Sequence, residues 1–455
     1  MKIKLIAPHD ENLLSSAETF KLKRLNLPLL AALTPPEHTV KIIDEAFAPD
    51  DIDHDFDLVG ITVMTDLALR AYRIADGYRQ QGVKVVMGGI HPTVLSHEAL
   101  HHADTVVTGE AEAVWRQVLS DAQSGQMRKV YSADGFTKLE GMPKPRWDLY
   151  PKPASRGYTP IPATVETSRG CPYDCEFCSI STVTGRRCRF RPAADVIAEI
   201  TAMESRYLFF VDDTLALRRS PAKELFRAMI PLRRFWAGQG GVALAEDLEL
   251  LKLMKRSGCV GLLVGFESVQ KETYSGMKKT SRLKIDFSEA MRRFHGEGLA
   301  ILGAFIFGLD HENKDVFDQT FEFIMKCRLD CAELRILTPF PGTRLYARLL
   351  SEGRLLEPHW WLHGYPPDTL LFQPRGMSPE SLLEGFDHLN REVYSMGAIV
   401  KRFLGMTPWR RSAMGCRAYA GFNLATRKRY LESLGIPQPF ARTPGREEES
   451  AWSSL

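Results

Sequence analysis

Two long stretches of this sequence alternate short apolar runs with helical patterns, and that alternation constrains the fold more than any other feature. In the first stretch, residues 1–145, the apolar runs have the length and composition of strands. They cover Lys2–Ala7, Thr39–Asp44, Asp57–Met64, Val83–Met87 and Thr105–Val107. A helical pattern follows at Ala68–Gln81. Such alternation is typical of a parallel sheet covered on both faces, so we expect an N-terminal doubly wound, Rossmann-like α/β domain.

The alternation resumes at residue 164, after a proline-rich linker predicted over residues 146–163. The predicted strands are Thr164–Thr167, Tyr207–Asp213, Val260–Phe266, Ala300–Phe307 and Glu333–Leu337. This repetition predicts a full or partial β/α (TIM-like) barrel over residues 164–352. Residues 353–436 combine aromatic side chains with helical patterns, which predicts a small, mostly helical region that caps the barrel. We expect the polar, proline-rich residues 437–455 to be disordered.

The composition is that of an ordinary globular protein and limits the classes of partner. Of the 455 residues, 44% are hydrophobic and 25% are charged, and a net charge of +3 gives no reason to expect a nucleic-acid partner. No apolar stretch reaches the roughly 18 residues of a membrane span, and the start does not resemble a signal peptide. Eight cysteines without a secretory signal indicate a reducing compartment, so we expect a cytoplasmic protein.

Three cysteines, Cys171, Cys175 and Cys178, stand in the spacing Cys-x3-Cys-x2-Cys. Iron–sulfur cubes in proteins are usually held by four cysteine thiolates, so a loop that supplies three leaves one iron open to a small molecule. A structural zinc site is the alternative if Cys188 completes a set of four, although no second pair of close-spaced ligands follows. A disulfide is disfavoured because no secretion signal is visible.

Distinctive residues follow the third, fourth and fifth predicted strands of the first domain, where parallel sheets bind their ligands. These candidate binding residues are Thr62, Met64, Thr65, Gly88, Gly89, His91, Pro92, Gly109 and Glu110. The paired glycines allow a flat ligand to approach the backbone, because a Cβ atom would intrude. Glycines that only make turns are the alternative, since such strand ends are often rich in glycine.

The cysteine loop and the strand ends ahead of it together resemble the cobalamin-dependent radical S-adenosylmethionine (SAM) enzymes, in which a B12-binding domain precedes a radical SAM domain. Residues Asp57–Trp115 carry most of the cobalamin likeness. The resemblance implies a [4Fe–4S] cluster held by the three cysteines, SAM on the open iron, and cobalamin against the strand ends. The Asp-x-His-x-x-Gly motif that supplies a cobalt ligand in many cobalamin proteins is missing. We therefore expect no histidine below the cobalt, and we expect His91 to contact the ring edge or a propionamide.

The same resemblance implies SAM-binding residues near the strand ends of the second domain. They are Phe177, Asp212, Asp213, Glu267, Ile306 and Gly308. Phe177 stands where the family has an aromatic residue near the adenine, and the acidic residues would meet the ribose or amino group of SAM, or the substrate. Gly303–Gly308 with Glu312 resembles the adenine-lining Gly-x-Ile-x-Gly-x-x-Glu segment, imperfectly because Ala304 replaces a glycine and Glu312 is one residue late. An ion pair or a helix cap is the alternative for Asp213.

The resemblance implies an enzyme, and its expected reaction is methylation of an unactivated carbon of a small molecule. A radical formed from SAM would remove hydrogen from the substrate, and cobalamin would donate the methyl group. An oxidative cyclase or a rearrangement enzyme without methyl transfer is the alternative. A non-catalytic cobalamin and cluster sensor is disfavoured by the SAM-side residues.

The expected partners are the substrate and an external electron donor of the flavodoxin or ferredoxin type. The aromatic C-terminal segment favours a large aromatic or hydrophobic substrate. Four arginines that follow the cysteine loop either grip anionic groups of a cofactor or substrate, or form a solvated basic face. They are Arg186, Arg187, Arg189 and Arg191.

Overall fold

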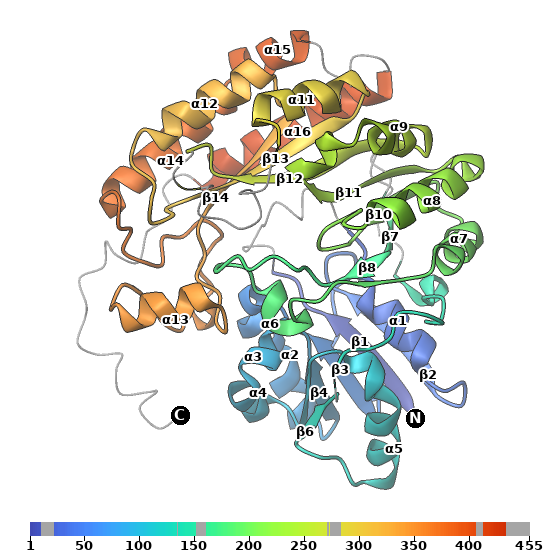
Figure 1. Cartoon of the computed structure of the whole chain (residues 1–455). Coiled ribbons are helices and arrows are strands. Elements are labelled where there is room, and N and C mark those ends of the chain that lie inside the picture. The colour runs from blue at the N-terminus through green and yellow to red at the C-terminus, as the bar shows by residue number, and fades with distance from the viewer. Residues whose placement is uncertain are drawn as a thin grey trace.

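The computed structural model describes residues 1–10, 22–133, 135–151, 161–270, 273, 284–405 and 413–433. It contains two α/β units, the first blue and the second green to orange in Figure 1. The tail predicted over residues 437–455 and half of the predicted linker, residues 152–160, lie outside the described residues.

The N-terminal unit is a six-stranded parallel sheet with the strand order β2-β1-β3-β4-β5-β6. Its strands are β1 (Lys2–Ala7), β2 (Thr39–Asp44), β3 (Leu58–Thr62), β4 (Lys84–Gly88), β5 (Thr105–Thr108) and β6 (Val130–Ser132). Helices α2 (Ala68–Gln80) and α4 (Ser96–His102) pack on one face, while α1 (Asn26–Leu33) and α5 (Trp115–Ser124) pack on the other. Helix α3 (Ile90–Val94) follows β4. The predicted doubly wound fold is confirmed, and among the strands of this unit the sequence missed only the short edge strand β6.

The second unit is also a six-stranded parallel sheet, in the order β14-β13-β12-β11-β10-β7. Its strands are β7 (Ala163–Val165), β10 (Tyr207–Phe210), β11 (Phe235–Gly241), β12 (Cys259–Glu267), β13 (Ala300–Phe307) and β14 (Cys331–Ile336). In the described part of the chain the edge strands β7 and β14 do not pair with each other, so the predicted barrel is a partial one. A short antiparallel pair, β8 (Ser168–Arg169) with β9 (Arg189–Phe190), flanks the cysteines together with α6 (Ile180–Thr184).

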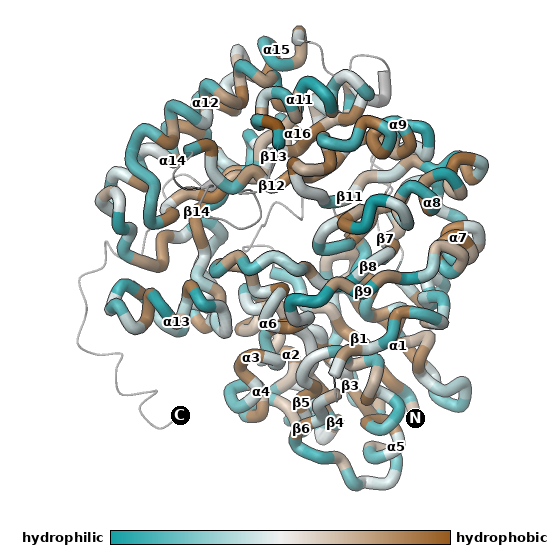
Figure 2. The backbone as a smooth tube through the Cα atoms, viewed as in Figure 1, coloured by the Kyte–Doolittle hydropathy of each residue, from teal (hydrophilic) through white to brown (hydrophobic). Residues whose placement is uncertain are grey.

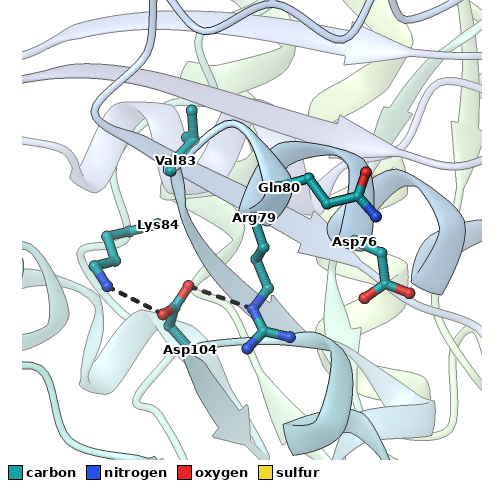
Figure 3. Close-up of a pocket in the computed structure, with 7 residues that line it drawn as sticks. Asp76, Arg79, Gln80, Val83, Lys84 and Asp104 are labelled. Atoms are coloured by element: carbon teal, nitrogen blue, oxygen red, sulfur yellow. Dashed lines mark hydrogen bonds and ion pairs between the residues drawn. The ribbon is translucent and has the colours of Figure 1, made fainter.

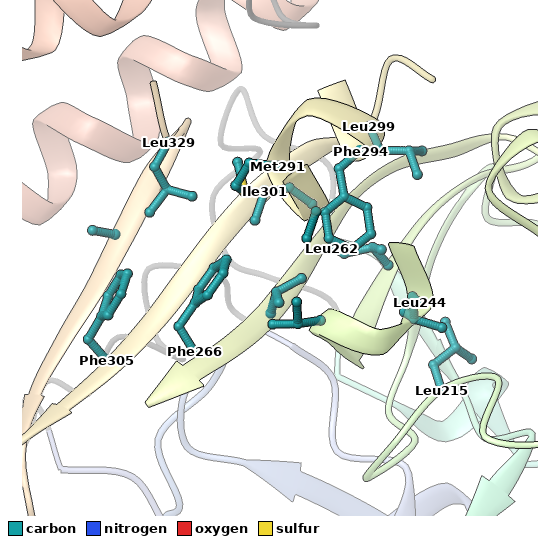
Figure 4. Close-up of a cluster of buried hydrophobic side chains, with 14 of the residues drawn as sticks. Leu215, Leu244, Leu262, Phe266, Met291, Phe294, Leu299, Ile301, Phe305 and Leu329 are labelled. Carbon is teal, nitrogen blue, oxygen red and sulfur yellow. The ribbon is translucent and has the colours of Figure 1, made fainter. Parts of the chain in front are cut away.

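Amphipathic helices follow the strands of the second unit and bury their apolar sides against the sheet. They are α7 (Ala193–Ala202), α8 (Arg219–Met229), α9 (Leu248–Arg256), α11 (Phe287–Gly296) and α12 (Val316–Cys327). Met291 and Phe294 of α11 belong to the same buried core as the strands, in which Phe266 and Phe305 stack on neighbouring strands (Figure 4). Figure 2 shows the resulting alternation of polar and apolar residues along the outer helices. This core fixes the strand ends that carry the candidate site.

The C-terminal region is mostly helical, as predicted, but part of it returns to the N-terminal unit. It follows α13 (Arg344–Ser351), and its helices are α14 (Pro379–Val393), α15 (Met396–Leu404) and α16 (Ala413–Ser433). Between α13 and α14, the 3-10 helix η8 (Trp360–Leu362) places Trp360 and Trp361 in the apolar cluster beside α2. The aromatic segment therefore bridges the two units.

Candidate functional site

The three cysteines lie in a half-buried loop, residues 170–179, which connects β8 to α6. Gly170 opens the loop with φ +90°, and a Cβ atom there would lie 2.1 Å from the carbonyl oxygen of Arg187. Only glycine fits this close approach. Burial raises the pKa of Cys188 to about 11, so this fourth thiol stays protonated.

Two carboxylates after β10 brace this loop. Asp212 is buried and accepts hydrogen bonds from the Thr167 amide (3.1 Å), the Thr167 hydroxyl (2.5 Å) and the Ser168 hydroxyl (2.6 Å). The neighbouring Asp213 accepts from the Gly170 amide at 2.7 Å. Burial raises the pKa of Asp212 to about 6. The expectation that Asp212 meets SAM or substrate is therefore corrected, because both of its oxygens are engaged with the strand that leads into the loop.

The ends of β12 and β13 form a second braced turn. Glu267 ends β12 with φ +63°, a left-handed conformation that a non-glycine residue keeps only when its surroundings enforce it. The buried Glu312 carboxyl accepts from the Ser268 hydroxyl (2.6 Å) and from the amides of Gly308 (2.9 Å) and Leu309 (3.1 Å). Glu312 thus holds the two strand ends side by side. Ile306 is half-buried on β13.

In the N-terminal unit, the predicted glycines do lie at the strand ends. Gly89 has φ +105°, and a Cβ atom there would lie 2.8 Å from the Val63 carbonyl oxygen. Gly109 has φ +75° and faces open space. Nearby, Thr62 accepts a hydrogen bond from Asn26 at 2.7 Å, Thr65 is buried, and the Arg24 guanidinium lies 3.0 Å from the sulfur of the exposed Met64.

His91 and Pro92 lie behind this surface. The His91 side chain is fully buried, with Nε2 2.8 Å from the Tyr72 hydroxyl and 3.1 Å from Glu98 Oε1. The Trp361 indole donates to the same Glu98 carboxylate at 3.1 Å. The expected contact of His91 with a ligand is therefore corrected: helix α3 begins at Ile90 and turns the imidazole back toward α2 and α4.

Glu110 belongs to a buried group of charges between the two units. It accepts from Arg189 Nη1 (2.8 Å) and from the Thr137 amide (2.8 Å). Arg169, which directly precedes the cysteine loop, pairs with Glu112 and Glu166 at 2.8 Å each. Sequence reasoning missed this group, because the charges that pair are far apart in the chain.

A cavity of about 310 Å³ lies between the strand ends of the N-terminal unit and the start of the cysteine loop. Its apolar floor comes from both the sheet and its helices and contains Leu5, Leu27, Gly60, Val86, Val107 and Trp115. Its rim is polar and contains Thr62, Gly88, Gly89, Gly109, Glu110, Glu112, Glu166, Arg169 and Asp213. Val183 and Thr184 of α6 complete the wall. The cavity therefore borders both candidate cofactor surfaces.

A second hollow, of about 440 Å³, lies at the opposite end of the first sheet. It is lined by Asp76, Arg79, Gln80, Val83, Lys84 and Asp104, and Lys84 and Arg79 both pair with Asp104 (Figure 3). It lies at the amino end of β4, away from the strand ends where parallel sheets bind ligands.

Comparison with known proteins agrees with this geometry. Residues 20–119 match the B12 binding domain and residues 165–324 match the radical SAM superfamily. The chain is 34% identical over 391 residues to bacteriochlorophyllide d C-12(1)-methyltransferase of Chlorobaculum tepidum. The aligned residues cover 84% of this chain and 84% of the relative. The chain belongs to the cobalamin-dependent radical SAM family. The C-8(2)-methyltransferase of the same organism is 28% identical over 358 residues, covering 74% of this chain and 78% of the relative.

The fold of this cobalamin-dependent radical SAM enzyme also matches a solved structure. TsrM from Kitasatospora setae, with cobalamin and [4Fe-4S] cluster bound, has a TM-score of 0.65 at 17% identity and covers 89% of this chain and 88% of its own. The enzyme is a methyltransferase whose cofactors are a [4Fe–4S] cluster, SAM and cobalamin. The three half-buried thiols of the cysteine loop suit the cluster, and the glycine-edged cavity with its apolar floor suits cobalamin. None of the helices in the described part of the chain has the length and apolar character that a bilayer crossing requires.

Proposed function

We propose that this enzyme methylates an unactivated carbon of a tetrapyrrole of the bacteriochlorophyllide type. The observation that carries the proposal is the single cavity bounded by the cobalamin-side strand ends and by the segment that leads into Cys171. A substrate between cobalamin at the rim of this cavity and the inner face of the partial barrel would meet both cofactors. The relative that is 34% identical acts on bacteriochlorophyllide d, which supports this substrate class.

In this proposal the cysteines Cys171, Cys175 and Cys178 hold the cluster, whose open iron binds SAM. Phe177, Asp213, Glu267, Ile306 and Gly308 line the SAM side. Thr62, Met64, Thr65, Gly88, Gly89 and Gly109 face cobalamin. SAM on the cluster supplies hydrogen-atom abstraction, and cobalamin supplies the methyl group.

The inner face of the partial barrel suits a flat apolar acceptor. Side chains alternate along a strand, and Ile301, Phe305 and Phe307 of β13 are buried in the core under the helices. Leu302, Ala304 and Ile306 are half-buried on the opposite face, which is therefore apolar along β13. An apolar wall excludes water from the reacting carbon.

The test uses enzyme reconstituted without oxygen with iron, sulfide and hydroxocobalamin, then given a reductant, bacteriochlorophyllide d and SAM labelled on its methyl group. Mass spectrometry should find the label first on cobalamin and then on the tetrapyrrole, together with 5′-deoxyadenosine. Consumption of SAM with loss of hydrogen from the tetrapyrrole and no label transfer would favour the cyclase alternative. Cys175→Ala should abolish both products, whereas Cys327→Ala on the remote helix α12 should not.

A further inference from the structure

The outer side of the cysteine loop carries two layers of charge. The carboxylates of Asp174, Glu176, Asp310 and Glu352 form the inner layer and are 13–39% exposed. Arg186, Arg344 and Arg375 form the outer layer and are 59–62% exposed. The guanidinium groups therefore project to solvent, and the carboxylates that fix them lie beneath.

Ion pairs tie these arginines directly to the cysteine loop. Asp174 pairs with Arg186 and with Arg344, each at 2.9 Å. Arg348 pairs with Glu176 at 2.7 Å, and the Leu345 amide donates to the Glu176 carbonyl at 2.9 Å. Because Asp174 and Glu176 flank Cys175 in the sequence, this charged surface borders the cluster-binding loop. Figure 1 shows α13 beside α6 at the boundary of the two units.

We define the arginine rim as Arg186, Arg344, Arg348, Arg354 and Arg375. Its five arginines stand against the four carboxylates of the inner layer, which leaves an excess of one positive charge. A second copy of the same surface would not attract it, and a nucleic-acid backbone is bound by many cations that are free to meet phosphate. A weakly positive surface whose outermost guanidinium groups project to solvent matches an acidic protein.

We propose that the arginine rim is the docking surface for an acidic one-electron carrier protein. This inference rests on the proposed function, because cleavage of SAM to the radical that removes hydrogen from the substrate requires an electron that the chain itself does not supply. The carrier would be oxidised by one electron and the cluster reduced by one, from [4Fe–4S]²⁺ to [4Fe–4S]⁺. No bond or proton is transferred in that step. Charge complementarity at the rim would steer the carrier to the loop that holds the cluster.

The test compares binding and reduction by flavodoxin, an acidic carrier, with reduction by dithionite, which needs no docking surface. The variant is Arg186→Gln with Arg344→Gln in cluster-loaded enzyme. We expect its Kd for flavodoxin, measured by calorimetry, to rise about tenfold at low salt, and the difference to shrink at high salt. Formation of 5′-deoxyadenosine should slow with flavodoxin and stay unchanged with dithionite.

The matched control is Lys252→Gln with Arg256→Gln, which neutralises two exposed cations on the remote helix α9 and should bind flavodoxin normally. If Arg186→Gln with Arg344→Gln also slows the dithionite reaction, Arg375→Gln replaces it, because Arg375 pairs with Asp310 and Glu352 rather than with the loop. Wild-type enzyme that does not bind flavodoxin, or a Kd unchanged in both rim variants, would overturn the proposal. Failure of methyl transfer alone would contradict the proposed function but not the docking surface, since flavodoxin binding and 5′-deoxyadenosine formation are measured separately.

Discussion

At the scale of single residues, Glu312 makes the stability of the enzyme depend on pH. Burial raises the pKa of this carboxyl from 4.5 to about 7. A group whose pKa is higher in the folded chain stabilises the fold below its unfolded pKa, and this contribution is lost as the pH rises through the folded value. We expect the free energy of unfolding to fall by up to about 3 kcal/mol between about pH 5 and about pH 8.

Glu312→Gln should remove most of that decrease, because an amide stays neutral and still accepts from the turn amides. Urea unfolding across the pH range measures it. The exposed Glu224→Gln on α8 should keep the wild-type pH dependence. A profile for Glu312→Gln that parallels wild type would contradict this account.

Gly170 is the residue on which the geometry of the cysteine loop depends most directly. In Gly170→Ala the new Cβ atom would meet the Arg187 carbonyl oxygen at 2.1 Å, so the backbone must move. We expect the iron and sulfide bound per chain after reconstitution to fall by at least about half. Gly125→Ala is the control: its φ is +72° but no atom lies within 4 Å, so it should cost about 1 kcal/mol and leave the iron content unchanged.

The roles of single residues were the hardest part to predict from sequence. The cysteine spacing and the strand-end glycines predicted the cofactors, because those signals are local. The roles of Asp212 and His91 depend on partners elsewhere in the chain. Asp212 bonds to Thr167, 45 residues away, and Glu98, which contacts His91, accepts from Trp361, 263 residues further along the chain than Glu98. No local pattern reveals whether a carboxylate at a strand end faces a ligand or braces a neighbouring strand.

At the scale of elements, η8 links the C-terminal region to the N-terminal sheet through two adjacent tryptophans. Trp361 donates to the Glu98 carboxylate, whereas Trp360 donates to the Pro339 carbonyl oxygen. Bonds to charged groups are the stronger, so Trp361→Phe should cost about 1.5–3 kcal/mol and Trp360→Phe about 1 kcal/mol. Urea unfolding gives both values. If both variants lower the free energy of unfolding equally, the bond from Trp361 to the Glu98 carboxylate stabilises the fold no more than a bond to a neutral carbonyl.

The strands that were predicted correctly from sequence are those whose residues are both apolar and buried. Strand β3 is buried on both faces, and β13 is apolar along its whole length although its burial alternates. Strand β11 was missed because three of its seven residues are glycine. Packing between β10 and β12 holds it in the sheet despite that composition. Tertiary context thus outweighed local propensity at this strand.

At the scale of the whole molecule, Arg169 joins the two units. Its guanidinium pairs with Glu112 of the first unit and with Glu166 of the second, and Glu110 lies 3.6 Å away. Arg169→Met would leave these buried carboxylates without one of their cations, and we expect it to lower the free energy of unfolding by about 3–5 kcal/mol. The exposed pair Arg146–Asp148 offers the control, since Arg146→Met should cost less than about 1 kcal/mol. A similar small cost for both would contradict a structural role for Arg169.

The return of Trp360 and Trp361 to the N-terminal unit also sets an order of events during synthesis. The sheet from β1 to β6 leaves the ribosome first, but the side chains that complete its α2 face are added much later. At roughly 5–20 residues per second, the roughly 230 intervening residues take roughly 10–50 s. Throughout that interval the nascent unit exposes an apolar face that other proteins in the cell can contact. The N-terminal sheet therefore gains its complete apolar cluster only after most of the second unit has been made.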